Sequence, residues 1–219
     1  MTIHDLHYNE IDKKTKDSFL VKPPPGFKSW IDVFKFNVLP DSYHVAIFGR
    51  PNNSNLLGGF KFDTKIENYL TSDLSLSDIL LADNITPVTE NNSFVKNGLQ
   101  IIPNPARQFP IDKPIHLYFE IYNLNREGQD KTSYSLEYTI KLIKQKKSAL
   151  KKLFSIFGGR SKSSISIKSD HEGDSEDSVE HLGVDVSKLK PGEYQLFVKV
   201  VDNNSGQIDE KEVKLFLIK

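Results

Sequence analysis

Cysteine is absent from this sequence of 219 residues, which excludes disulfide bonds, thiol nucleophiles and thiolate metal ligands. Burial of apolar side chains must therefore hold the fold together. Long apolar runs are also missing, since no stretch approaches the ~20 apolar residues of a membrane-spanning helix. Residues 1–7 show neither the basic nor the apolar region of a signal peptide. As given, the chain is expected to be soluble and to be part of a longer protein, and its compartment stays open.

An excess of charge of either sign is likewise absent, because 29 Lys and Arg residues balance 29 Asp and Glu residues. A neutral chain has no overall field that attracts nucleic acid, so no nucleic-acid partner is expected. Catalytic motifs are missing as well: the sequence has no Gly-x-Ser-x-Gly motif, and no glycine-rich phosphate loop opens a helix. We therefore expect no enzyme activity and no cofactor.

The titratable residues show no spacing typical of a metal or acid–base site. Among six histidines, His4 and His7 form a close pair, whereas a zinc site needs three or four converging ligands. The acid-rich run 170–177 lacks the residue order of a calcium-binding EF-hand loop and is expected to be a solvated loop. Glu120 and Glu137 could lie across a strand pair, as glycosidase carboxylates do, but polar patterning of a solvent-facing sheet is the simpler interpretation. No metal site is expected.

Apolar and polar residues alternate along much of the chain, which is the pattern of half-buried β-strands. In residues 116–122 the pattern directs Leu117, Phe119 and Ile121 to one face, and residues 133–142 repeat it. The polar stretch 123–132 between them is expected to be a hairpin loop. Further strands are expected at 30–38, 43–48, 59–66, 99–102, 164–168, 194–201 and 212–218. A short basic helix is expected at 146–157.

Two segments of the sequence resemble each other at a constant spacing. Leu39 to Ile47 parallels Leu189 to Val198, and the alignment places Tyr43 and Tyr194 151 positions apart. The same offset carries Asn52-Asn53-Ser54 onto Asn203-Asn204-Ser205, which argues for an internal duplication over a chance recurrence of turn-and-strand patterns. A turn followed by Tyr at a strand start is typical of an immunoglobulin-like tyrosine corner. Tyr43 and Tyr194 are therefore expected to bond the backbone just upstream.

The repeat predicts an all-β protein made of two immunoglobulin-like β-sandwich units. The first unit is expected at 1–82, a linker at 83–96, and the second unit at 97–219 with a basic excursion at 144–163. About five strand candidates precede residue 83, against the seven usual for a sandwich, so the first unit is short or incomplete. A short unit leaves a sheet edge bare, which makes self-association through strands an expectation.

The basic and apolar segment 146–160 is the strongest candidate interaction element. It could dock on an anionic membrane surface or in the acidic groove of a protein partner. Alternatively, its apolar residues fold back onto the sandwich, or its cations pair with the acidic run 170–180. The candidate interaction residues are Lys147, Leu150, Lys151, Leu153, Phe154, Phe157 and Arg160.

Four segments together resemble the C-terminal β-sandwich region of bacterial envelope-associated proteins of the GWxTD-domain type. They are Leu74 to Ala82, Tyr118 to Leu124, Leu153 to Arg160, and Leu189 to Val200 with its Pro-Gly-x-Tyr core. The motif that names the group is absent, because the only tryptophan, Trp30, lies in Ser-Trp-Ile. The resemblance implies an accessory or scaffold module at the cell envelope or in the periplasm, with no catalytic residues to carry over.

These features predict a non-catalytic structural or protein-interaction module of a larger envelope-associated protein. One alternative is a peripheral membrane-surface module that uses segment 146–160. The other is a carbohydrate-binding sandwich that uses the outer aromatic residues Tyr118 and Tyr122 of the strand 116–122. A protein partner is expected, but its identity does not follow from the sequence.

Overall fold

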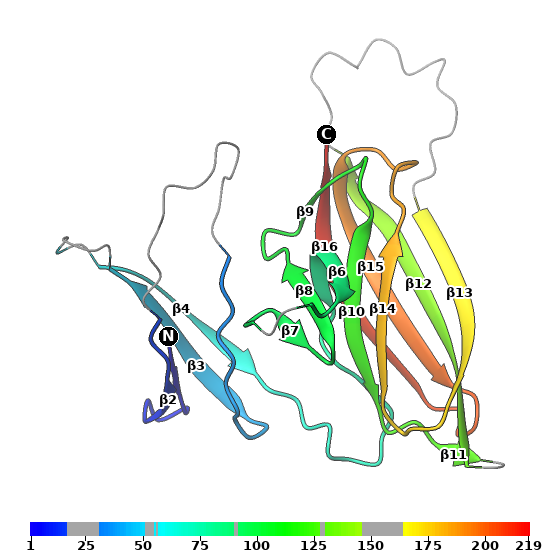
Figure 1. Ribbon diagram of the computed structural model, residues 1–219, viewed down its shortest axis with the longest axis horizontal. Helices are drawn as coiled ribbons and strands as arrows, with labels where there is room; N and C mark the ends of the chain where they lie inside the picture. Colours follow the sequence, from blue (N-terminus) through cyan, green and yellow to red (C-terminus); the bar gives the residue numbers. More distant parts are fainter. Residues whose placement is uncertain (17–30, 51–54, 56, 90–91, 128–129, 146–163) are drawn as a thin grey trace, which may run out of the picture. The chain divides into compact units, whose positions relative to one another are not determined.

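The computed structural model describes residues 1–16, 31–50, 55, 57–89, 92–127, 130–145 and 164–219. These residues form strands joined by turns and loops, with no helix among them, so the expected all-β class is confirmed (Figure 1). The chain divides into two compact units, unit 1 from Met1 to Leu70 and unit 2 from Thr71 to Lys219. The expected basic helix at 146–157 lies outside the described residues.

Unit 1 is one four-stranded antiparallel sheet in the order β2-β1-β3-β4. A small core of Ile3, Tyr43 and Val45 lies on one face, where Phe36 and Val38 pack against it. The strands are β1 (Thr2–His4), β2 (Glu10–Lys13), β3 (Ser42–Gly49) and β4 (Gly58–Lys65).

The prediction of a strand at 30–38 is wrong for residues 31–38, which the structure describes and which form no strand. Side chains occupy the backbone acceptors that a neighbouring strand would use: Lys14 donates to the carbonyl of Lys35, and Lys16 to that of Val33 at 2.6 Å. The same ammonium groups lie over the rings of Phe36 and Phe34, about 5 Å from each centroid. The alternation in this segment therefore serves to cover the sheet.

Unit 2 is built from two sheets that share one apolar core. The first, here called the β10 sheet, has the order β14-β10-β6-β8-β7 with β5 beside β10. The second, the β15 sheet, has the order β11-β12-β15-β16-β9 with β13 beside β12. The β10 sheet contains β5 (Ser75–Leu76), β6 (Leu80–Pro87), β7 (Val95–Lys96), β8 (Leu99–Pro103), β10 (Ile115–Tyr122) and β14 (Ser178–Val184). The β15 sheet contains β9 (Gln108–Pro110), β11 (Arg126–Glu127), β12 (Lys131–Gln145), β13 (Ser164–Gly173), β15 (Gly192–Asp202) and β16 (Ile208–Ile218).

The expected inward faces of β10 and β12 are confirmed. Leu117, Phe119 and Ile121 point into the shared core from β10, where Leu136 and Ile140 meet them from β12. The hairpin expected between these strands is wrong, because β10 and β12 lie in different sheets. Alternation of apolar and polar residues indicates which side chains of a strand are buried. It does not indicate which strand lies next to it in the sheet, because that depends on long-range packing.

The boundary expected at 83–96 differs from the division in the structure, which falls between Leu70 and Thr71. Residues 80–87 form β6, which pairs with β10 and with β8 in unit 2. A shift in the ladder between Ala82 and Asn84 interrupts the alternation there, and Pro87 lies at the strand's end. A β-bulge and a terminal proline therefore gave this strand the composition of a linker.

Candidate functional site

The hairpins β3–β4 and β15–β16 share one register. Tyr43 lies opposite Thr64, and Tyr194 lies opposite Leu215, so both partners of each pair are 151 positions from their counterparts. The flanking strands correspond as well, since the order β2-β1-β3-β4 of unit 1 matches β13-β12-β15-β16 within unit 2. Unit 1 thus has the strand arrangement of one sheet of unit 2.

The expected tyrosine hydrogen bonds are present in both hairpins. The Tyr43 hydroxyl donates to the carbonyl of Leu39 at 2.7 Å, and the Tyr194 hydroxyl donates to that of Lys190 at 2.8 Å. Both rings are buried, and each bond spans four residues. Each phenol therefore fixes the turn before its strand to the strand itself.

The corresponding faces of the two hairpins differ sharply in burial. In unit 2, Tyr194, Leu196 and Val198 are buried in the core that the β10 sheet shares. In unit 1, the matching strand buries Tyr43 and Val45 but leaves Ile47 38% exposed. The apolar side chains of β3 are therefore less buried toward Gly49, where unit 1 has no second sheet among its described residues.

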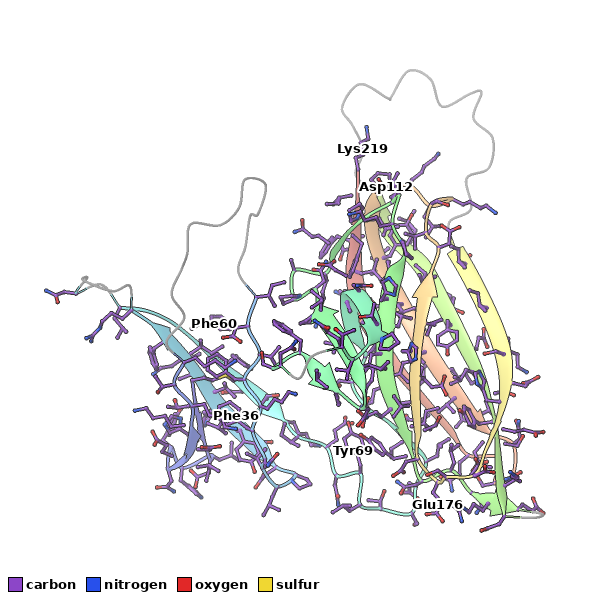
Figure 2. All side chains as sticks on the ribbon, viewed as in Figure 1. Phe36, Phe60, Tyr69, Asp112, Glu176 and Lys219 are labelled. Atoms are coloured by element: carbon purple, nitrogen blue, oxygen red, sulfur yellow. The ribbon has the colours of Figure 1, made fainter. Side chains whose placement is uncertain are left out.

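Three apolar side chains on this part of unit 1 form what we call the open face: Ile47, Phe60 and Phe62. Phe60 lies opposite Ile47 and is 65% exposed, whereas Phe62 is 38% exposed. The Phe60 and Phe62 rings stack at 5.6 Å between centroids. Figure 2 labels Phe60 on this sheet and Phe36, which packs over the small core of the same face. Exposed aromatic side chains gathered on one face are typical of a binding surface.

Sequence reasoning missed the open face, although the signal was present. The sequence predicts a strand at 59–66, which contains Phe60-Lys61-Phe62, and does not indicate which of its sides is covered. The shortage of strands in the first unit implied that the apolar side of this strand had too few apolar partners. Combining the two observations would have pointed to β4.

A hollow of about 550 Å³ lies at β1, β2 and the residues that follow β2. Its cations are Lys13, Lys14, Lys16 and Lys61. Two of these cations are already engaged with carbonyl oxygens, and Lys16 also pairs with Asp32 at 2.5 Å. Lys14 and Lys16 are therefore held by groups of unit 1 itself.

A buried carboxylate, that of Glu120, lies at the centre of a hydrogen-bond network in unit 2. Glu120 projects from the outer side of β10 and forms an ion pair with Lys96 at 2.7 Å. Tyr118 donates to it at 2.5 Å, Tyr122 donates as well, and Asn97 donates at 3.2 Å. Burial by itself would raise the pKa of Glu120, but the bonds from Lys96 and the two phenols outweigh it and hold that pKa below its ordinary value. The carboxylate is thus ionised, paired and structural.

The outer aromatic residues Tyr118 and Tyr122 belong to the same hydrogen-bond network. Tyr118 is almost fully buried, with the Lys96 ammonium 5.1 Å from its ring centroid and Asn97 bonded to its hydroxyl. Its ring therefore offers no open platform for a sugar. Glu137 lies on β12 in the other sheet, so it does not face Glu120 across a strand pair.

The candidate interaction residues Lys147, Leu150, Lys151, Leu153, Phe154, Phe157 and Arg160 lie outside the described residues. The acidic run 170–180, expected as their alternative partner, comprises the end of β13, the turn 174–177 and the start of β14. The solvated loop expected at 170–177 is wrong for residues 170–173, which pair with β12 up to Gly173 opposite Thr132. Lys141 and Ser164 pair at the opposite end of the same two strands, nine residues from Thr132. Asp174 instead contacts Lys131, which lowers the pKa of its carboxyl.

Within the described ranges, no group of three or more His, Asp or Glu side chains is placed to hold a metal ion. Nor does this part of the chain contain a helix long and apolar enough to cross a membrane. No protein-family model matches the chain, and no curated protein matches it.

Proposed function

We propose that the chain is a non-catalytic structural or protein-interaction module whose binding surface is the open face of unit 1. The carrying observation is that Ile47 and Phe62 are exposed at positions whose counterparts in unit 2, Val198 and Val213, are buried in the core. The exposed Phe60 lies beside them. A partner that covers these side chains would remove apolar surface from water, which drives association.

We further propose that the two units are immunoglobulin-like and arose by duplication. The shared offset of 151 in sequence, register and tyrosine hydrogen bonds supports this origin. Unit 1 would then be a copy whose described residues form one of the two sheets. The resemblance to bacterial envelope-associated proteins supports a scaffold role in a larger protein at the cell envelope.

A photo-crosslinking residue placed at position 60 tests the proposal in cells that produce the protein. Ile208 is the matched control, because it is an exposed apolar residue on a strand of unit 2. We expect a discrete protein adduct from position 60 and none from position 208. Equal labelling at both positions, or no protein adduct at position 60, would contradict the proposal. Flotation with liposomes that depends on Leu153, Phe154 and Phe157 would favour the membrane-surface interpretation instead.

A further inference from the structure

The outer edge of β4 has no neighbouring strand among the described residues, where β4 pairs with β3 alone. The corresponding strand of unit 2 is covered at both ends. β9 pairs in parallel with Phe216–Ile218 of β16, and the Asp209 carboxylate accepts from the backbone of Leu76 at 2.7 Å. The same edge is thus occupied in one unit and bare in the other.

The ladder fixes which backbone groups of β4 point outward. The N–H of Ile66 donates to the carbonyl of Asp41 at 2.8 Å, so this pair is hydrogen-bonded. Bonded and non-bonded pairs alternate in an antiparallel ladder. Phe60, Phe62 and Thr64 therefore bond to β3, while the N–H and C=O groups of residues 59, 61, 63 and 65 point away from the sheet. Such a row of groups is a template for another strand.

We propose that the occupant of this edge is a second copy of the chain. Two β4 strands pair antiparallel about Phe62, which joins two four-stranded sheets into one. This rests on the proposed function, because it names the partner of the same open face. In this register Phe62 lies opposite Phe62 of the second copy, and Lys61 lies opposite Asp63 of the second copy, twice by symmetry.

Charge and backbone geometry select the same register. Lys61 and Asp63 carry the outward N–H and C=O groups, so their pairs are the hydrogen-bonded ones and Phe62 meets its counterpart at the closer, non-bonded position. A shift by two residues in either direction would place Lys61 opposite Lys61, or Asp63 opposite Asp63, which is destabilising. A shift by one residue would place Phe62 opposite a charged residue and break the continuity of the open face.

The paired sheet also joins the two open faces. Ile47, Phe60 and Phe62 of both copies then lie on the same side of one sheet, because directly opposite residues share a face. Phe62 gains an aromatic neighbour across the new strand pair, in addition to Phe60 on its own strand. Association therefore reduces the exposure of Phe62.

Sedimentation velocity of the full chain over a range of concentrations tests this register. We expect a dimer for the wild type, and dimer dissociation constants raised on the order of tenfold or more for Lys61→Asp and for Asp63→Lys, since each variant places like charges opposite each other. An equimolar mixture of the two variants should dimerise again, and so should the double variant, because both restore opposite charges. Lys214→Asp, an exposed position of β16, is the control and should behave as wild type.

A wild type that stays monomeric at the highest concentration overturns the inference, as do single variants that dimerise normally or a mixture that stays monomeric. Circular dichroism checks that Asp63→Lys folds, because the wild-type carboxylate also bonds His44 at 2.6 Å. The crosslink from position 60 separates this inference from the proposed function. An adduct with a different protein, from a monomeric chain, removes the second copy and keeps the interaction module. An adduct with neither removes both.

Discussion

Two tyrosines, Tyr43 and Tyr194, hold equivalent turns through a single hydroxyl each. Tyr194→Phe keeps the buried ring and leaves the carbonyl of Lys190 without this donor, so we expect the free energy of unfolding to fall by about 1 kcal/mol. Urea denaturation measures the loss. Tyr8→Phe is the control, because Tyr8 is 72% exposed, and it should leave stability unchanged. An equal loss in both variants would argue against a specific role for the bond in the turn.

The carboxylate of Glu120 should make stability depend on pH. Its pKa in the folded state lies below the ordinary value of 4.5, so the stabilisation is present above that value and is lost as pH falls through the lowered pKa. Glu120→Gln cannot ionise, and its deficit in unfolding free energy relative to wild type should be larger at pH 7 than at pH 3. Lys96→Met should remove part of the same pH dependence, and the two changes should not add. A deficit that is constant with pH would contradict the pairing.

Among the strand connections, the β7–β8 hairpin depends on its two turn residues. Asn97 and Gly98 both have positive φ, 47° and 74°, as a two-residue type I′ turn requires. Gly98→Ala is expected to lower the free energy of unfolding by about 1–2 kcal/mol, although its Cβ would meet nothing within 4 Å. Gly183→Ala in β14 is the matched control: its Cβ would make ordinary contacts near 3.6 Å with His116, and no loss is expected. Equal stability of the two variants in thermal denaturation would remove the turn explanation.

The sequence predicted strands where alternation was strong and missed them where side chains had other roles. The inward residues of β10 and β12 followed from period-two patterning, because each strand has one face in the core. The composition of β6 is typical of a linker because the strand contains a bulge and a proline. No strand was expected at β14, because the acidic run 170–180 extends into it; Glu180 lies on its half-buried face and accepts a hydrogen bond from Tyr134. The strand pairing and the open face required tertiary information. The ladder shows that β4 repeats a strand of a sandwich whose second sheet has no counterpart among the described residues of unit 1.

At the scale of the whole molecule, the two units differ in the size of their buried cores. Unit 2 carries the large core, whereas unit 1 fully buries only Ile3, Tyr43 and Val45 in its described cluster. A sheet of four strands with so small a core is marginal by itself. Covering the open face would therefore stabilise unit 1, so partner binding and folding of this unit are expected to be coupled.

The position of the division between the units can be tested with two fragments. A fragment of residues 71–219 keeps every strand of both sheets of unit 2 and should unfold cooperatively. A fragment that starts at residue 83, the expected linker, loses β5 and the first residues of β6, and with them the buried side chains of Leu74, Leu76, Leu81 and Ala82. Deleting three buried leucines should lower the free energy of unfolding by more than about 4 kcal/mol. Urea denaturation compares the fragments, and equal stability would show that β5 and β6 are dispensable and would return the boundary to 83–96.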